Sequence, residues 1–247
     1  METTISPKII HHPNGAGSAL IGQPVNRRER GVSTLASALH EIQIKPIPIR
    51  VAKELLVREH YLHAFSGGTC LAFGVFLDAQ MLGALTLGVG PTNAYRLVDG
   101  AASRDCLTLT RLWLADELPR NSESRVIGLL FKALKRNTSL RFLISYADPT
   151  QGHVGTIYQA TNWVYAGLSQ ATPLYDLGDG KARHSRSVSH VYGTHSLRHF
   201  AARGVRAKLV SQSQKHRYIF FLDTAWRERL RVNGQPYPKL EEEDGGH

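Results

Sequence analysis

The sequence predicts a single α/β domain in which helices flank a mixed sheet. Short segments with period-two alternation of apolar residues, typical of strands, are interspersed with segments whose apolar residues recur at helical spacing. Their order is strand, helix, hairpin, strand, helix, central strand, helix, strand, which combines antiparallel pairs with crossover connections. The 247 residues are 42% hydrophobic, which is enough for the core of one large domain.

The first half of this domain is predicted to be largely antiparallel. The expected elements are a strand over residues 42–47, a helix over 49–62 and a hairpin of strands 71–77 and 81–89. Pro46 stops the first strand, and Val51 and Leu55 give the helix its apolar spacing. The short turn at Asp78 joins the two strands of the hairpin.

The second half is predicted to contain parallel crossovers. The expected strands are 107–114, 142–147, 163–168, 207–211 and 218–222, and the expected helices are 122–137, 155–161, 195–202 and a short one from Trp226. Strand 142–147 is almost wholly apolar, as expected at the centre of a sheet. This order of elements is similar to the acyltransferase fold of the GNAT superfamily, so the expected fold class is a GNAT-like mixed sheet.

Two extensions are predicted on either side of the domain, which we place at residues 43–235. Residues 1–42 contain an arginine cluster and little apolar periodicity, which predicts a flexible basic N-terminal extension. Residues 236–247 contain the acidic run Glu241 to Asp244, which predicts a flexible tail.

Composition favours a polyanionic partner and excludes several other classes. Thirty Lys and Arg against twenty Asp and Glu give a net charge of +10, and phosphate neutralisation drives much of nucleic-acid affinity. The sequence contains no run of eighteen apolar residues, so no membrane span is predicted. The N-terminus lacks the layout of a signal peptide. Only Cys70 and Cys106 occur, so neither a disulfide framework nor a cysteine-based zinc site is expected, and a reducing cytoplasm is the expected location.

Positive charge is densest beyond residue 179, where aromatic residues are interleaved with it. The residues predicted to contact DNA phosphates are Arg183, Arg186, Lys215 and Arg217. A solvated basic face is the alternative interpretation.

Arg111 and Asp148 are the first candidates for chemistry. Strand alternation places Leu107, Leu109, Arg111 and Trp113 on one face, so that Arg111 interrupts an apolar stripe and needs a partner. Asp148 ends the next central strand, at the edge where open α/β sheets bind ligands. We therefore expect Arg111 and Asp148 to pair, or both to contact one substrate. A purely structural ion pair is the alternative.

The loop before helix 122–137 is a candidate anion site. Asn121 or Ser122 is expected to be the N-cap, and free backbone N–H groups at a helix N-terminus favour an anion. Arg120 would add positive charge there, although ordinary capping explains Asn121 and Ser122 equally well.

Two further segments contain histidines. His153 lies between two glycines in a loop that opens a helix, and its ordinary pKa near 6.5 suits acid or base catalysis. His60 and His63 end the first predicted helix. A shared metal would need a third ligand, so a favourable interaction with the helix C-terminus is the simpler explanation.

Five segments are shared with a known family. They are HYLH at 60–63, LTRLW at 109–113, DELPRNSES at 116–124, SYAD at 145–148 and GHVGTIYQATNW at 152–163. Together and in this order, they resemble the Mom family of phage or prophage enzymes. Members of that family convert adenine in DNA to N6-carbamoylmethyladenine, which blocks host restriction, and their fold is GNAT-like. The resemblance implies an enzyme encoded by a phage or prophage that acts on double-stranded DNA in the cytoplasm of a bacterial cell.

The resemblance also implies a set of site residues. The positions expected to line the reaction centre are Tyr61, Arg111, Ser122 or Ser124, Ser145, Asp148 and Tyr158, with His60 and His153 as secondary candidates. Arg120, Asn121, Ser122 and Ser124 are the candidates for binding the group donor. Tyr61, Tyr158 and Trp163 are candidates for stacking on a flipped adenine, although Trp163 equally suits the core.

The donor, the metal content and the oligomeric state stay open. GNAT acetyltransferases hold the pyrophosphate of acetyl-CoA with a glycine-containing loop, whereas residues 120–125 contain no glycine. Acetyl-CoA, another acyl donor or an iron-dependent step are therefore alternatives, and no metal ligands are assigned. The alternative functions are a GNAT-type N-acyltransferase acting on a small molecule or protein, and a DNA-binding module without catalysis.

Overall fold

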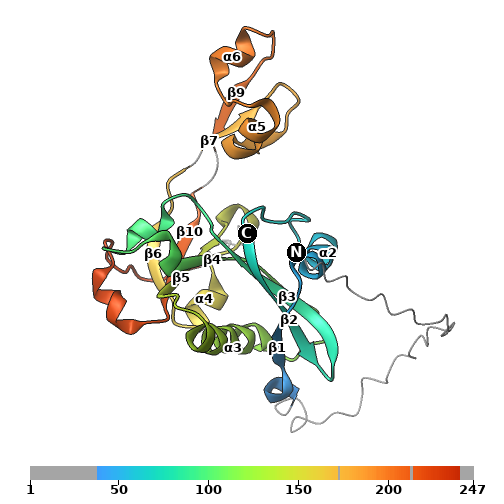
Figure 1. Ribbon diagram of the computed structural model, residues 1–247, viewed down its shortest axis with the longest axis vertical. Coiled ribbons are helices and arrows are strands. Elements are labelled where there is room, and N and C mark those ends of the chain that lie inside the picture. Colours follow the sequence, from blue (N-terminus) through green and yellow to red (C-terminus); the bar gives the residue numbers. More distant parts are fainter. Residues whose placement is uncertain (1–37, 172, 212–213, 240–247) are drawn as a thin grey trace, which may run out of the picture.

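A computed structural model describes residues 38–171, 173–211 and 214–239. Its main sheet has seven strands in the order β1-β2-β3-β4-β5-β10-β6 (Figure 1). The strands are β1 (Gln43–Pro46), β2 (Thr69–Leu77), β3 (Gln80–Gly88), β4 (Cys106–Leu114), β5 (Phe142–Ala147), β6 (Val164–Leu168) and β10 (His216–Phe221). The mixed sheet flanked by helices confirms the predicted fold class.

Only one neighbouring pair of this sheet, β4 and β5, is parallel. Several parallel crossovers were expected in the second half, and that expectation is wrong. The reason is that β10 inserts between β5 and β6 and pairs antiparallel with both, which separates two strands that would otherwise be neighbours.

The sheet separates two apolar layers. Helix α3 (Ser122–Asn137) packs Val126, Leu130 and Leu134 on one face, against Leu85 and Leu143 among others. Helix α2 (Ile49–Glu59) covers β2 to β4 on the opposite face. On that same face, residues 94–106 and 226–232 cover β5, β10 and β6.

Local sequence signals explain the element boundaries. The β2–β3 hairpin turns at Asp78 and Ala79, both with positive φ, which matches the right-handed twist of the strands. Helix α3 has the predicted bounds, whereas α2 ends at Glu59 rather than residue 62, so that His60 and Tyr61 follow the helix instead of ending it.

The described part of the main domain also contains a short α-helix and four short 3-10 helices. Helix α4 (Thr156–Ala160) connects β5 to β6, and short 3-10 helices lie at η1 (Ala94–Leu97), η2 (Ser103–Asp105), η3 (Pro149–Gln151) and η4 (Thr224–Arg229). The expected final helix from Trp226 is thus a 3-10 helix. No helix in the described ranges is long and apolar enough to cross a membrane.

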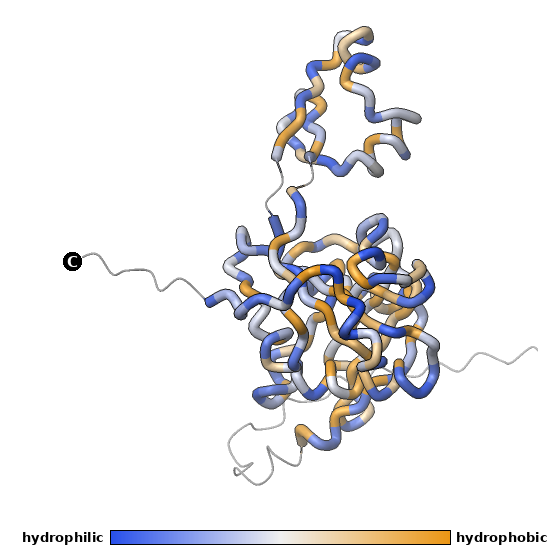
Figure 2. The backbone as a smooth tube through the Cα atoms, turned by 90° about the vertical axis from the view of Figure 1, so that its left-hand side faces the viewer, coloured by the Kyte–Doolittle hydropathy of each residue, from blue (hydrophilic) through white to orange (hydrophobic). Residues whose placement is uncertain are grey.

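Residues 173–211 form a second, smaller unit between β6 and β10, which the sequence did not indicate as separate. Its three-stranded sheet has the order β8-β7-β9. The elements are β7 (Pro173–Asp176), β8 (Ala182–His184), α5 (Ser185–Tyr192), α6 (Leu197–Ala201) and β9 (Lys208–Ser211). Tyr175, Val188 and Phe200 form its own apolar cluster, and Figure 2 shows apolar segments within it. We call residues 173–211 the small subdomain.

Both ends of the main domain differ from the predicted boundaries. Residues 38–41 are helical, and Ala38 and Ile42 are buried, so the folded part begins before residue 43. Toward the C-terminus, the Tyr237 hydroxyl donates to the Trp163 carbonyl oxygen at 2.7 Å, and the Pro238 carbonyl accepts from Gln159. The flexibility expected of residues 1–37 and 240–247 falls outside the described residues.

Candidate active site

A β-bulge at Thr110 sets the direction of Arg111. Arg111 pairs with Thr86 and Leu109 pairs with Leu87, so that Thr110 is an extra residue on β4. The predicted common face for Leu107, Leu109, Arg111 and Trp113 is therefore wrong, because alternation does not continue through a bulge. Leu107 and Leu109 face α3, whereas Trp113 packs on the α2 side, and Arg111 shares the alternation of Trp113.

Strands β4 and β5 separate just before this bulge. Their pairing covers only Cys106 to Thr108 of β4 and ends at Ile144 of β5. In a continuous sheet the backbone layer keeps side chains of opposite faces apart. Here the strands separate, so that groups from the two faces can meet between β4 and β5.

Ser145 and Tyr158 lie at the point where the strands separate. Ser145 is fully buried, and its Oγ lies 3.0 Å from the Leu109 carbonyl oxygen and 2.7 Å from the Tyr158 hydroxyl. A carbonyl only accepts, so the serine donates to Leu109 and the Tyr158 hydroxyl donates to Ser145. Burial raises the pKa of Tyr158, so its phenol is neutral at pH 7.

Gly155 allows α4 to bring Tyr158 to this position. It is the N-cap of α4 with φ of 79°, and a Cβ there would lie 2.4 Å from the Tyr218 ring. Only glycine accommodates both the left-handed backbone and the close approach. The predicted loop between two glycines is therefore a structural requirement for placing Tyr158.

Arg111 presents a guanidinium with unused donors. Its Nε donates to the Ala64 carbonyl at 3.2 Å and one terminal nitrogen donates to the Thr110 carbonyl at 2.6 Å. Burial lowers the pKa of Arg111, but arginine stays charged in proteins. No carboxylate of the described residues lies within ion-pair distance of it, so its remaining N–H groups are available to a substrate.

Asp148 is held by a different cation from the one expected. Its carboxylate lies 3.2 Å from Lys215 Nζ and accepts from the Thr150 hydroxyl and backbone N–H. Bonds from Thr150 and Lys215 outweigh burial and lower the pKa of Asp148, so it is ionised at neutral pH. The predicted direct pair with Arg111 is thus replaced by an Asp148–Lys215 pair, since β10 lies beside β5.

Aromatic rings form the exposed part of the site. Tyr61 stacks on His60 with ring centroids 4.4 Å apart, and its edge meets His153 at 5.3 Å. Burial raises the pKa of Tyr61, Arg111 lowers it and Asp148 raises it, so the phenol lies near both charged groups. Tyr61 is half exposed, which leaves a ring face available for stacking.

His60 is neutral at pH 7, and its imidazole accepts a backbone hydrogen bond. It is 6% exposed, and burial, together with Arg111, His153 and His63, lowers its pKa to about 4. Its Nδ1 accepts from the Leu62 backbone N–H, so the ring proton is on Nε2.

The low pKa of His60 predicts an acid-sensitive term in stability. The unfolded chain binds a proton near pH 6.5 and the folded chain near pH 4, so this contribution is lost as the pH falls between these values. In the wild type, the unfolding free energy should decrease between pH 7 and pH 4, in part because of His60. In His60→Asn, which keeps an acceptor near Nδ1, we expect this decrease to be smaller by about 1–3 kcal/mol. Urea denaturation at several pH values measures this difference. The exposed-site variant His63→Asn is the control, and an unchanged pH dependence in His60→Asn would contradict the assignment.

Most of the chain matches the model of a known protein family. The model of the Mom protein family matches residues 41–239, most of the chain. The chain belongs to the Mom family. It is 31% identical over 211 residues to methylcarbamoylase mom of Escherichia phage Mu, covering 81% of this chain and 84% of that protein.

Solved structures similar to this Mom-family chain are N-acetyltransferases with low sequence identity. An N-acetyltransferase from Staphylococcus aureus Mu50 is 12% identical with a TM-score of 0.40, covering 73% of this chain and 97% of that one. Spermidine/spermine N-acetyltransferase SpeG from Vibrio cholerae is 6% identical with a TM-score of 0.44, covering 77% and 98%. NAA60 from Arabidopsis thaliana is 11% identical with a TM-score of 0.43, covering 73% and 98%.

The candidate donor-binding residues of this Mom-family protein lie at the start of α3. Because β4 and β5 are parallel, that helix begins at the sheet edge where Asp148 ends β5. Asn121 is the N-cap, as expected, but it has φ of 68° and makes no side-chain capping bond. The buried Ser122 hydroxyl donates to the Pro119 carbonyl at 2.6 Å. Arg120 is exposed and Ser124 is half-buried.

The four predicted DNA-contacting residues do not form one free surface. Lys215 pairs with Asp148, and Arg183 forms an ion pair with Asp179. Arg217 is half-buried and donates to the Ala166 carbonyl. The side chain of Arg186 falls outside the described residues. Three of the four therefore have acidic or carbonyl partners within the chain, and their contact with DNA stays a prediction.

Lys215 has a partner that the sequence did not indicate. It is predicted to contact DNA, which stays a prediction, and the structure pairs it with Asp148, a contact that depends on the insertion of β10 beside β5. Trp163 is fully buried and belongs to the core, not to a stacking surface. Within the described ranges, no group of three or more His, Cys, Asp or Glu side chains is arranged to hold a metal ion.

Proposed function

We propose that this Mom-family protein is a transferase that converts adenine in double-stranded DNA to N6-carbamoylmethyladenine, inside the bacterial host of a phage. Membership of the family over residues 41–239 carries the proposal. The site between β4 and β5 supports it, since it combines an exposed aromatic ring, an arginine without a carboxylate partner among the described residues, and an ionised carboxylate. The net charge of +10 suits a DNA substrate.

In this proposal each group has a separate part in binding the adenine. The exposed Tyr61 ring stacks on a flipped base, supported from behind by His60. The Asp148 carboxylate accepts a hydrogen bond from the N6 amino group and takes its proton as the bond from N6 to the methylene carbon forms. At the same time the bond between that carbon and the leaving group of the donor breaks, and the leaving group takes the electron pair. Arg111 donates to the carbonyl oxygen of the incoming carbamoylmethyl group and to developing negative charge on the donor. The buried Ser145–Tyr158 pair holds the two separated strands in place.

Atom balance constrains the donor. A carbamoylmethyl group contains an amide nitrogen and joins N6 through a methylene carbon, whereas acetyl transfer from acetyl-CoA supplies no nitrogen and gives an amide at N6. Acetyl-CoA alone therefore cannot supply the group. The start of α3 also fits the cofactor incompletely, because residues 120–125 contain no glycine and the Ser122 hydroxyl is already used. The proposal accordingly requires a nitrogen-containing donor or a second nitrogen source.

Nucleoside mass spectrometry tests the proposal. DNA from bacteria that express the full chain is digested to nucleosides and compared with DNA from cells that carry an empty vector. We expect a deoxyadenosine species heavier by one carbamoylmethyl group only in the expressing cells. Unmodified DNA together with acetyl-CoA turnover would instead indicate an N-acyltransferase of another substrate. Unmodified DNA with tight, salt-dependent DNA binding would indicate a binding module.

A further inference from the structure

The small subdomain contains half of the net positive charge of the chain. Residues 173–211 include seven Lys and Arg and two Asp, an excess of five out of the ten in the full sequence. Both acidic residues are already occupied. Asp176 accepts from the backbone N–H groups of Gly178 and Gly180 and pairs with Lys208, and Asp179 pairs with Arg183.

Three exposed arginines remain without an acidic partner. Arg198, Arg203 and Arg206 form no ion pair with any carboxylate of the described residues. Arg203 approaches His199 Nε2 at 2.6 Å, which orients its guanidinium without neutralising it. Arg203 also lines a hollow of about 370 Å³, together with Tyr192, Phe200 and the Asp179–Arg183 pair.

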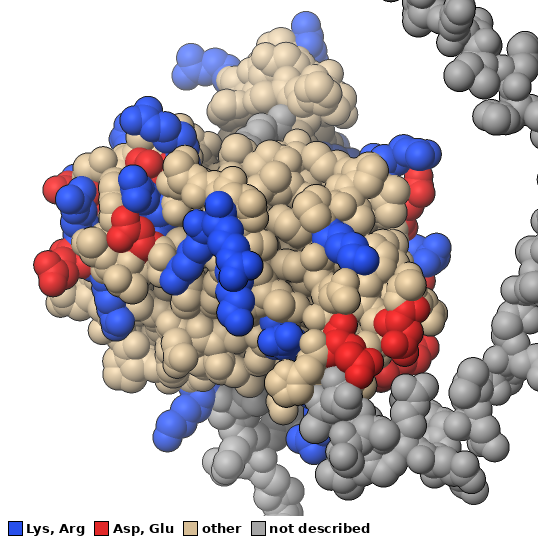
Figure 3. Space-filling model, turned by 60° about the horizontal axis from the view of Figure 1, so that its bottom comes forward, with Lys and Arg blue, Asp and Glu red and all other residues tan. Residues whose placement is uncertain are grey.

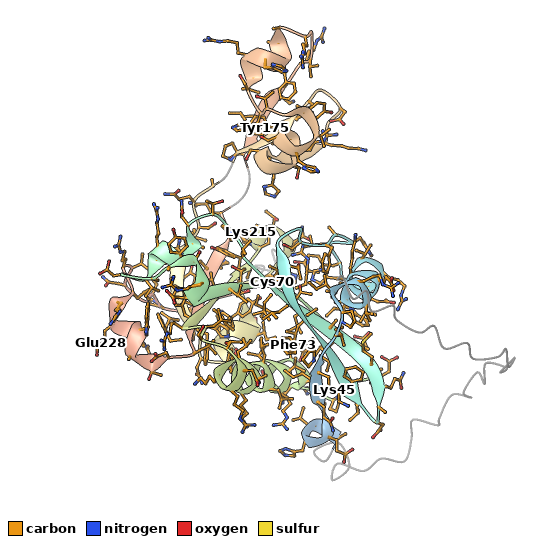
Figure 4. The ribbon with its side chains drawn as sticks, in the orientation of Figure 1. Lys45, Cys70, Phe73, Tyr175, Lys215 and Glu228 are labelled. Atoms are coloured by element: carbon orange, nitrogen blue, oxygen red, sulfur yellow. The ribbon has the colours of Figure 1, made fainter. Side chains whose placement is uncertain are left out.

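The subdomain is attached directly beside Asp148. Its two connections leave the main domain at Ser169 and Lys215, which hold each other through two hydrogen bonds, Ser169 N–H to the Lys215 carbonyl and Lys215 N–H to Ser169 Oγ. Lys215 is also the residue that pairs with Asp148. Figure 4 shows Lys215 at the edge of the main domain that faces the small subdomain, in which Tyr175 is labelled.

The connections are too short to let the subdomain move far from the site. Pro173 and Ser211, its first and last residues, are paired in the sheet and lie four residues from Ser169 and Lys215 respectively. Four extended residues span at most about 14 Å, so the paired ends Pro173 and Ser211 stay within that distance of Ser169 and Lys215.

From this arrangement we infer that the small subdomain is a phosphate-binding arm, which contacts the DNA backbone flanking the adenine through Arg198, Arg203 and Arg206. This inference rests on the proposed function for DNA as the substrate. The charge of the small subdomain and its attachment beside Asp148 are features of the structure. On the face of the main domain in Figure 3, basic side chains gather near the centre, and acidic side chains lie toward two of its edges. Phosphate contacts fix the position of a protein on DNA without reading its sequence, which would orient the duplex over the stacked Tyr61.

The test compares two triple variants of the full chain. Arg198, Arg203 and Arg206 are replaced with glutamine in one, and Lys132, Lys135 and Arg136 in the other. The control residues are exposed and lie in the second half of α3, toward the end of the helix that leads into the start of β5, away from Asp148. Binding to a fluorescent double-stranded oligonucleotide is measured from low to high salt, and thermal unfolding verifies that both variants are folded.

We expect the subdomain variant to bind at least about tenfold more weakly at low salt, with a log–log salt slope smaller by about 1–3. The α3 variant should lose much less affinity. Equal losses in both variants, or wild-type binding by the subdomain variant, would overturn the inference. Nucleoside analysis separates the two proposals: a wild-type chain that fails to modify DNA while the subdomain variant loses binding contradicts the proposed chemistry and supports the arm.

Discussion

Arg111→Ala is expected to lower the rate of DNA modification by about 10²–10³-fold, the usual cost of removing one positioned donor from a transition state. The guanidinium is partly buried, contacts only the carbonyls of Ala64 and Thr110, and keeps further N–H groups for the substrate. Nucleoside mass spectrometry of cellular DNA at equal expression measures the loss.

Two control variants define what Arg111 contributes. Arg111→Lys keeps the charge but loses the planar fork, so an intermediate rate is expected. Arg58→Ala removes an exposed arginine whose partner is its neighbour Glu59, and should leave modification unchanged. A folded Arg111→Ala protein that modifies DNA at the wild-type rate would exclude this arginine from the site.

Asp148→Asn is expected to lower modification by about 10²–10⁴-fold, the usual contribution of a general base. The change keeps the shape of the side chain and removes its charge, so the amide can neither take a proton from N6 nor balance Lys215. Because hydrogen bonds and Lys215 lower the pKa of Asp148, wild-type activity should not depend on the titration of this residue between pH 6 and pH 8.

Lys215→Met provides the matched comparison for Asp148. This change removes the Lys215 ammonium group, which lowers the pKa of Asp148. The Asp148 carboxylate still stays ionised at pH 7, so most of the modification activity should persist. If Asp148→Asn and Lys215→Met reduce modification equally, the ion pair as a whole supports the structure and the assignment of Asp148 as proton acceptor is wrong.

The amino-acid sequence by itself determined most elements of the main domain. Helix 122–137 and strand 142–147 have the predicted bounds, because apolar periodicity and chain-breaking residues act locally. It also singled out residues that the structure brings together, since Tyr61, Arg111, Asp148 and His153 approach one another, while their roles stay predictions.

The tertiary structure decided how those residues face one another. The bulge at Thr110 reverses the alternation of side chains along β4. This extra residue is recognised only from the pairing of β4 with β3, so the sequence of β4 alone does not reveal it. The pairing of Asp148 with Lys215 depends on β10 lying between β5 and β6, although β10 follows β6 by more than forty residues of chain. Contacts between residues far apart in the sequence require the whole sheet, so local spacing cannot predict them. The small subdomain was missed for the related reason that its strands are only three or four residues long and carry a weak periodic signal.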